Sequence, residues 1–303
     1  MTATNPPRDG GLGRDLQPGH LFCFGLGFSA RYLADRLLAR GWRVSGTCRS
    51  PEKQQALAAL GITAHLFDRD RPVSDLVGLL AGVTDVLSSV PPDSAGDPVI
   101  DLHKNDLAQA ASHLSWIGYL STTGVYGDRD GAWVDEASAL TPSGERGRRR
   151  LHAEQAWLSL PQPAHLFRLA GIYGPGSSAL DTVRDGKARR VVKQGQVFSR
   201  IHVADIAAVL EASMAQPRPG AAYNVCDDDP APPADVVTYA CELLGVAPPP
   251  EVPYESADLS PMARSFYDDN KRVRNDLIKQ ELGIELAFPS YRTGLKNIFD
   301  SGG

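Results

Sequence analysis

The chain has few of the features that mark disulfide-bonded, metal-binding or membrane proteins. Only 4 of its 303 residues are cysteine. They lie far apart and form no C-x-x-C pair, so we expect reduced thiols and no metal site. No run of 18 apolar residues is present, and residues 1–18 lack the apolar segment of a secretory signal. These absences predict a cytoplasmic protein without membrane contact, with a flexible leader over 1–18.

The charge balance excludes a further class of partner. The formal net charge is −5, and no basic stripe is interleaved with aromatic residues, which argues against nucleic acid. A small-molecule substrate is therefore the expected partner. The length of 303 residues is sufficient for one large sheet domain with a smaller appended region.

Strand-like and helix-like segments alternate from residue 20 to about residue 170. This alternation predicts an α/β fold, a Rossmann-type doubly wound parallel sheet with a small C-terminal substrate cap. Proline-rich breaks cut the C-terminal part into short pieces. We expect residues 19–180, with 196–228 returning to them, to form the nucleotide-binding domain, and residues 181–195 and 229–303 to form the cap.

The most informative segment is the glycine-rich turn after the first expected strand. Gly25, Gly27 and Ala30 form a G-x-G-x-x-A pattern where this strand runs into a helix. Gly25 permits a tight turn, Gly27 lets the backbone approach a pyrophosphate, and Ala30 allows close helix packing, while free N–H groups at the helix start face the anion. With Phe28 and Ser29, these residues predict a dinucleotide site; the alternative is a turn that binds nothing.

The end of the second expected strand indicates which dinucleotide binds. A site that prefers NAD usually places Asp or Glu here, against the ribose 2′-hydroxyl. This chain has Arg49 and Ser50 instead, with Lys53 one turn later. Because a guanidinium can pair with a 2′-phosphate, we expect NADP as the cofactor and leave NAD open. The alternative interpretation is a solvated loop arginine.

Four landmarks along the chain resemble the extended short-chain dehydrogenase/reductase superfamily, in its NAD(P)-dependent epimerase/dehydratase-like branch. They are the loop Ser121-Thr122-Thr123-Gly124-Val125-Tyr126-Gly127, the turn Arg168-Leu169-Ala170-Gly171-Ile172-Tyr173-Gly174-Pro175-Gly176, the stretch Ile201-His202-Val203-Ala204-Asp205-Ile206-Ala207, and the strand Tyr223-Asn224-Val225.

The resemblance assigns expected roles to residues near these landmarks. It implies that Thr122 is the active-site hydroxyl that bonds a substrate carbonyl or hydroxyl, and that Thr123, Tyr173 and His202 border the substrate. It also implies a cofactor wall, for which the expected residues are Ser88, Ser89, Val90 and Asp68. The alternative for Thr122 is a threonine that satisfies a turn, for His202 a structural hydrogen-bonding histidine, and for the strand-end residues an ordinary cap.

The chain departs from the family at the expected Tyr-x-x-x-Lys. The run Arg146-Gly147-Arg148-Arg149-Arg150 is found there instead. In the family the tyrosine is the general acid/base, and an arginine cannot replace it because a guanidinium stays protonated and has no acceptor. Tyr126 is the nearest phenol that could act in its place; the alternative is an aromatic side chain that packs the pocket wall. Arg150 could still bond the nicotinamide ribose, as the family's lysine does.

Basic residues near the expected substrate side, among them Arg146 and Arg200, indicate an anionic ligand; the alternative is a solvated charged face. We therefore expect an NADP-binding oxidoreductase or epimerase-like enzyme of the atypical type. One alternative is a non-catalytic NADP(H)-sensing protein. Another is a nucleotide-sugar epimerase or dehydratase, which Phe198 disfavours because it occupies the position of the diphosphate-binding arginine. The family also implies a homodimer through helices near 99–114 and 147–160.

Overall fold

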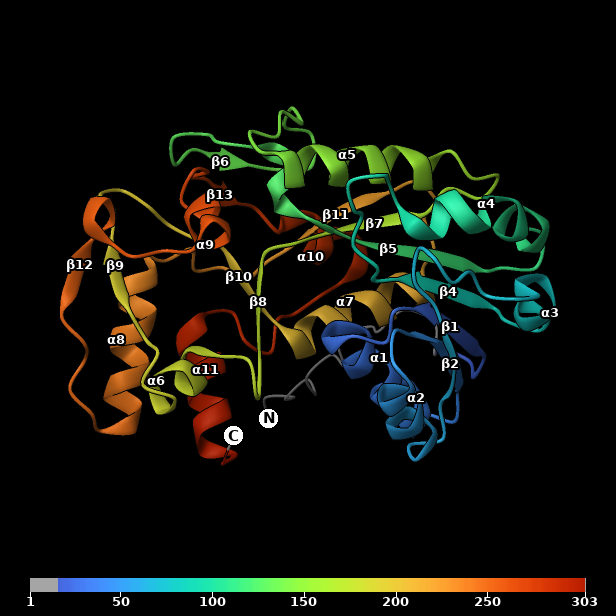
Figure 1. Ribbon diagram of the computed structural model, residues 1–303, viewed down its shortest axis with the longest axis horizontal. Helices are drawn as coiled ribbons and strands as arrows, with labels where there is room; N and C mark the ends of the chain where they lie inside the picture. Colours follow the sequence, from blue (N-terminus) through green and yellow to red (C-terminus); the bar gives the residue numbers. More distant parts are fainter. Residues whose placement is uncertain (1–15, 303) are drawn as a thin grey trace, which may run out of the picture.

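The computed structural model describes residues 16–302, so most of the predicted leader over 1–18 lies outside the described residues. Its centre is a seven-stranded sheet in which every pairing is parallel (Figure 1). In spatial order the strands are β11 (Ala222–Val225), β7 (His165–Leu169), β5 (Trp116–Thr122), β4 (Asp85–Ser88), β1 (His20–Phe24), β2 (Arg43–Cys48) and β3 (Thr63–Leu66). The strand order reverses between β1 and β4, as in a doubly wound fold, which confirms the predicted fold class.

Helices cover both faces of this sheet, which explains why its strands read as continuous apolar runs. One face packs against α1 (Phe28–Ala39), α2 (Pro51–Ala58), α7 (Val203–Ala215) and α10 (Asp276–Leu282). The other packs against α3 (Leu76–Leu80), α4 (Pro98–Ala110) and α5 (Glu145–Leu158) (Figure 1).

Strand β1 shows how alternation divides one apolar run between two cores. Leu21 and Cys23 belong to the cluster on the α1 face, whereas Phe22 and Phe24 belong to the cluster on the α4 face. All four side chains are fully buried. Burying a side chain of this size stabilises the fold by about 1.5–3 kcal/mol, so the central strand is fixed from both sides.

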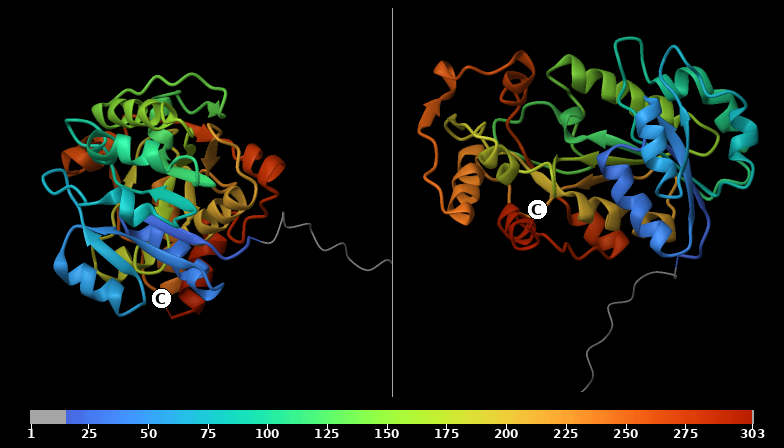
Figure 2. Two further views of the ribbon diagram at one scale, coloured as in Figure 1. Left: turned by 90° about the vertical axis from the view of Figure 1, so that its right-hand side faces the viewer. Right: turned by 60° about the horizontal axis from the view of Figure 1, so that its bottom comes forward.

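The C-terminal elements form a smaller layer at one end of the molecule, away from β1, β2 and β3 (Figure 2). It contains α6 (Ala179–Arg184), β9 (Arg190–Val192), α8 (Pro233–Leu244), β12 (Glu251–Pro253), η2 (Tyr254–Ser256), α9 (Pro261–Phe266) and α11 (Tyr291–Asp300). We refer to these elements as the cap. A separate apolar cluster, which includes Leu180, Ala240 and Leu295, holds α6, α8 and α11 together.

Two short parallel pairs connect the sheet to the cap. β8 (Gly171–Tyr173), just after β7, pairs with β10 (Arg200–His202). β6 (Trp133–Val134), which follows the 3-10 turn η1 (Thr123–Tyr126), pairs with β13 (Arg272–Val273). The pairing of β6 with β13 brings the C-terminal segment that carries β13 against the loop after β5.

The four cysteines are buried free thiols. Within residues 16–302, no helix is both long enough and apolar enough to span a bilayer. The same residues contain no group of three or more His, Cys, Asp or Glu side chains arranged to hold a metal ion.

Candidate functional site

Two cavities open at the carboxyl ends of the parallel strands, where doubly wound folds bind ligands. The smaller, of about 680 Å³, lies beyond β1, β2 and β4, at the reversal of strand order. The larger, of about 860 Å³, lies beyond β5 and β7 and extends to the cap. We refer to them as the turn cavity and the threonine cavity.

The glycine turn forms one wall of the turn cavity. Gly25 has a φ of +80°, a conformation that favours glycine. Its N–H donates to Oγ1 of Thr47 at 2.9 Å, and its carbonyl accepts from the hydroxyl of Ser89. These contacts anchor the turn to β2 and to the end of β4.

Gly27 has the features expected of a residue that faces an anion. It is the N-cap of α1 and has no side-chain capping bond, and a Cβ built on it would meet nothing within 4 Å. The first N–H groups of α1 thus lack a side-chain partner at the point where the backbone borders open space. This arrangement fits a pyrophosphate, so the residues present fit a dinucleotide. Ala30 is fully buried against the sheet, as the motif requires, and Ser29 is buried beside it.

The side chain of Phe28 does not take part in the predicted dinucleotide site, so only its backbone N–H, the first of α1, is placed to do so. Phe28 is 39% exposed, packs edge-on against Tyr32 with the ring centroids 5.5 Å apart, and is not among the residues that line either cavity. Ser88 was predicted to line the cofactor site, and this prediction is also wrong. Its side chain is fully buried and does not line the turn cavity, whereas the next two residues, Ser89 and Val90, do.

The outer end of the turn cavity is lined by the cations that the sequence singled out. Arg49 is exposed there, and Ser50 caps α2 by accepting from the N–H of Lys53 at 3.3 Å. Lys53 also lines the cavity. Asp68 lines it too, paired with Arg71 at 2.7 Å. Because Asp68 is already neutralised by this pair, the charge left facing this end is positive.

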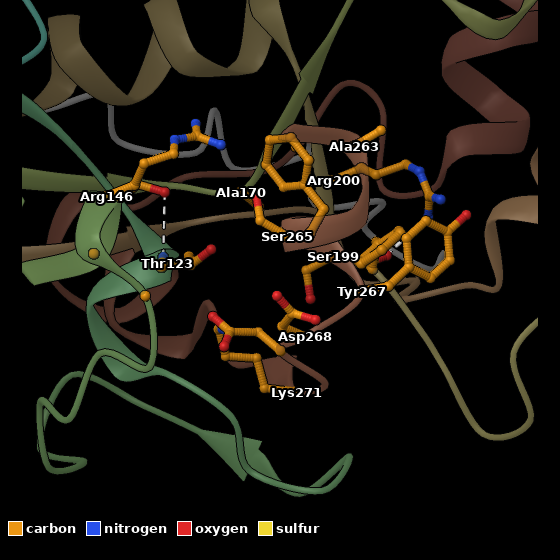
Figure 3. Close-up of a pocket in the computed structure, with 18 of the residues that line it drawn as sticks. Thr123, Arg146, Ala170, Ser199, Arg200, Ala263, Ser265, Tyr267, Asp268 and Lys271 are labelled. Atoms are coloured by element: carbon orange, nitrogen blue, oxygen red, sulfur yellow. Dashed lines mark hydrogen bonds and ion pairs between the residues drawn. The ribbon is translucent and has the colours of Figure 1, made fainter. Parts of the chain in front are cut away.

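The threonine cavity brings together most of the predicted catalytic and substrate residues (Figure 3). They are Thr122, Thr123, Arg146, Arg150, Tyr173 and Arg200. Thr122 ends β5, and its Oγ1 accepts from the N–H of Gly124 at 3.2 Å, so the hydroxyl also serves the turn. This leaves its own proton free to donate.

The arginines of this cavity differ in how many hydrogen bonds their guanidinium groups already make to the protein. Arg146 is exposed, and its guanidinium lies 4.8 Å from the ring centroid of Phe266. Arg150 donates to the carbonyl of Leu120. Arg200 donates to two backbone carbonyls, those of Phe198 at 2.8 Å and Ala231 at 3.0 Å. Arg146 is therefore the cation most available to a ligand.

Tyr126 does not reach the threonine cavity, which contradicts its predicted part in proton transfer. It is fully buried, donates to Oδ1 of Asn224 at 2.7 Å and accepts from Arg168 at 2.9 Å. Burial raises the pKa of Tyr126 to about 12, although the nearby Arg168 charge acts in the opposite direction. Its phenol is thus a structural hydrogen-bonding group.

No sequence pattern indicated the buried ion pair that lies beneath this loop. Arg168 and Glu154 form a bidentate pair, with N–O distances of 3.1 and 2.9 Å, and their side chains are only 5% and 2% exposed. Glu154 also accepts from the hydroxyl of Ser121 at 2.5 Å. The pair links α5 to β5 and β7 directly below Thr122.

His202 is likewise structural, contrary to its predicted place beside the substrate. It is buried, and its Nδ1 accepts from the N–H of Ala204 at 3.2 Å at the start of α7. Its ring packs against Phe288, with centroids 4.1 Å apart. Burial lowers the pKa of His202 to about 4, so the imidazole is neutral near physiological pH.

Residues of the C-terminal segment that line the threonine cavity were not predicted from the sequence. Ser265, Tyr267, Asp268 and Lys271 line it from the C-terminal segment (Figure 3). They are far from the threonine loop in sequence and belong to no recognised motif. Only the three-dimensional fold places them at the site.

No family model matches the chain. A solved structure, a functionally unknown conserved protein from Silicibacter pomeroyi DSS, is 53% identical with a TM-score of 0.87, covering 94% of this chain and 99% of that one. Protein YeeZ of Escherichia coli (strain K12) is 28% identical over 283 residues, 88% of this chain and 94% of that protein.

The fold is also similar to that of dTDP-glucose 4,6-dehydratase from Bacillus anthracis str. Ames in complex with NAD. The TM-score is 0.71 at 15% identity, over 93% of this chain and 96% of that chain. The chain therefore has the fold of solved epimerase and dehydratase structures.

Proposed function

We propose that this chain is a member of the extended short-chain dehydrogenase/reductase family and an NADP(H)-dependent oxidoreductase or epimerase-like enzyme. Its substrate would be a carbonyl or hydroxyl of a small anionic metabolite. The observation that carries the proposal is that the glycine turn and Thr122 border two cavities at one edge of the same sheet. The NAD complex of the B. anthracis dehydratase, which has the same fold, supports a nicotinamide dinucleotide as the cofactor.

Within this proposal the residues of the turn cavity hold the dinucleotide. Gly27 and the first N–H groups of α1 receive the pyrophosphate, because this is where the backbone is open and uncapped. Arg49 and Lys53 receive the 2′-phosphate that distinguishes NADP from NAD. When bound, the dinucleotide would supply or accept a hydride.

The threonine cavity then receives the substrate. Thr122 donates a hydrogen bond from its hydroxyl to the reacting oxygen and so fixes the position of that oxygen. Arg146, with Arg189 near the cap, attracts a phosphate or carboxylate elsewhere on the substrate. Arg150 and Arg200 add positive charge to the walls, although backbone carbonyls already occupy part of their bonding capacity.

The test of the cofactor assignment is a pair of charge reversals at opposite ends of β2. Arg49→Glu should weaken NADPH binding by about 10- to 100-fold, because charge-assisted hydrogen bonds contribute about 1.5–3 kcal/mol, while NADH binding should change little. Arg43→Glu alters an exposed arginine at the other end of the strand and is the matched control. Calorimetric titration of both variants with both dinucleotides measures the effect. Equal losses for NADPH and NADH would refute the role of Arg49.

The position of Tyr126 supports a second candidate, a protein that binds NADP(H) and reports its redox state without catalysis. Neither Arg146, which cannot release a proton, nor the buried Tyr126 can replace the missing acid. An NADPH oxidation assay distinguishes the two functions, because only an enzyme oxidises NADPH when a suitable carbonyl compound is supplied.

A third candidate, a nucleotide-sugar epimerase or dehydratase, is the least favoured. Phe198 lines the threonine cavity in place of the diphosphate-binding arginine, and Arg200 is held by backbone carbonyls. Heat released on titration with UDP-glucose or dTDP-glucose would favour it, and no heat would remove it.

A further inference from the structure

A lysine from the C-terminal segment lies beside the threonine loop. Lys271 lines the threonine cavity, and its Nζ donates to the carbonyl of Gly127 at 2.9 Å. Gly127 directly follows η1, the turn that begins at Thr123. In Figure 3 the Lys271 side chain extends toward the side of the cavity that holds Thr123, whereas Tyr267 lies on the opposite side.

Backbone contacts fix the segment that carries this lysine. The carbonyl of Asn270 accepts from the N–H groups of Arg129 and Gly131, each at 3.0 Å. The N–H of Asn270 donates to Oδ1 of Asp128 at 2.8 Å, and β13 pairs with β6 immediately afterwards. The position of Lys271 relative to the threonine loop is therefore set by the fold and not by a single side-chain contact.

The hydrogen bonding of Lys271 leaves capacity for a ligand. An ammonium group has three donors, and the described residues provide two acceptors, the carbonyl of Gly127 and Oδ2 of Asp269 at 3.1 Å. The third N–H is available on a side chain that is 10% exposed and borders the cavity. A substrate oxygen in the cavity could take this position.

The charges around Lys271 determine its proton affinity. Burial lowers the pKa of Lys271; Asp269 and the charge of Asp128 raise it, and the charge of Arg129 lowers it further, with burial the largest effect. The other charged groups that line the cavity are Glu145, Arg146, Arg150, Arg189, Arg200 and Asp268. A lysine whose pKa is lowered in this way exchanges a proton more readily near neutral pH.

The phenols near this cavity are less suited to proton exchange than Lys271. The hydroxyl of Tyr126 lies in the core network. The hydroxyl of Tyr173 donates to the carbonyl of Ser290 at 3.3 Å. Tyr267 lines the cavity with its ring packed against those of Phe198 and Tyr254, but burial raises its pKa, which makes its phenol a weaker acid than an ordinary tyrosine.

We propose that Lys271 is the catalytic residue that exchanges a proton with the substrate, in the role that the family assigns to the missing tyrosine. This inference rests on the proposed function. In a reduction, the carbonyl carbon would receive the hydride electron pair from reduced nicotinamide dinucleotide while its oxygen takes one proton from the Lys271 ammonium. Lys271 would become a neutral amine and recover a proton from water; oxidation runs the same transfers in reverse.

The first test measures the titration of Lys271 in the intact protein, without substrate. Trace acetylation with acetic anhydride across a pH series, quantified by peptide mass spectrometry, gives a midpoint for each lysine. Lys187 and Lys296 are exposed ion-paired references whose pKa values are raised by their Asp partners. We expect a lower midpoint for Lys271 than for either reference. A midpoint equal to or above theirs would overturn the inference, whatever the protein's activity.

The second test compares NADPH oxidation by the full-length protein across a panel of anionic carbonyl compounds. Lys271→Met and Lys271→Arg should each lower kcat by about 10²–10⁴-fold, the usual contribution of general acid catalysis, with little change in the Kd for NADPH. Lys104→Met is the control, since Lys104 is exposed and, among residues 16–302, donates to the Ser159 hydroxyl, far from the loop after β5 in sequence.

The arginine variant distinguishes proton transfer from a purely electrostatic role. It keeps a positive charge that can still bond Gly127 but does not release a proton. In the plot of kcat against pH, the change due to the titration of Lys271 should therefore disappear. Wild-type kcat in Lys271→Arg, with an unchanged pH profile, would overturn the inference while leaving the proposed function intact. A wild-type protein inert on the whole panel would overturn both.

Discussion

Replacing Gly27 by alanine separates the binding role of the glycine turn from its structural role. Gly27 has a φ of −81°, which alanine adopts without strain, and a Cβ at this position would meet nothing within 4 Å. We therefore expect a free energy of unfolding within about 0.5 kcal/mol of wild type. The new methyl group would project into the space where the proposed pyrophosphate approaches the N–H groups of α1.

The expected loss of affinity follows from the hydrogen bonds that this methyl group would displace. If one charge-assisted bond from a backbone N–H is lost, at about 1.5–3 kcal/mol, NADPH should bind about 10- to 100-fold more weakly. Gly25→Ala is the contrasting variant, because Gly25 has a φ of +80° and its Cβ would lie 3.0 Å from Oγ of Ser89. It should lower stability by about 1–2 kcal/mol from backbone strain alone. Differential scanning fluorimetry measures stability and calorimetry measures binding; a Gly27→Ala protein that binds NADPH like wild type would refute the assigned pyrophosphate position.

Two further predictions concern buried groups beside the site. Glu154→Gln should destabilise the protein by about 3–5 kcal/mol in urea unfolding, because it leaves the buried Arg168 charge without its partner; a loss below about 1 kcal/mol would show that the pair is not truly desolvated. His202 has a folded pKa of about 4, below its unfolded value of about 6.5, so its contribution to stability is present above pH 6.5 and is lost as the pH falls toward 4. The difference in unfolding free energy between wild type and His202→Gln should therefore shrink over this range, and a pH-independent difference would contradict the shift.

The alternation of apolar segments along the chain and the order of its motifs were sufficient to predict the fold. The alternation of strands and helices from residue 20 onward gave the parallel sheet, and the glycine spacing located the turn at Gly25 and Gly27. These features are local, since a strand buried on both faces and a turn with positive φ each leave a direct trace in sequence. The resemblance to the family placed Thr122 and Arg146, and both line the same cavity.

The wrong assignments share a physical cause. Tyr126 and His202 lie within one or two residues of site positions in sequence, but neighbouring side chains in a strand or at a helix start point in different directions. Both therefore face the core, where the Tyr126 hydroxyl bonds Asn224 and Nδ1 of His202 accepts from the N–H of Ala204. Ser88 lies inside the sheet for the same reason. Sequence proximity to a motif does not determine which way a side chain points.

Lys271 could not be predicted because its position depends on a contact between distant segments. The pairing of β6 with β13 and the bonds from Asn270 bring it to Gly127. A proton donor supplied in this way makes catalysis depend on the docking of the C-terminal segment, whereas a donor on α5 would be fixed within the sheet domain itself. The contact between Arg146 on α5 and Phe266 on α9 crosses the same cavity. Under the proposal for Lys271, any change that loosens this docking should lower kcat while leaving NADPH affinity intact, because the turn cavity is built without the segment that carries Lys271.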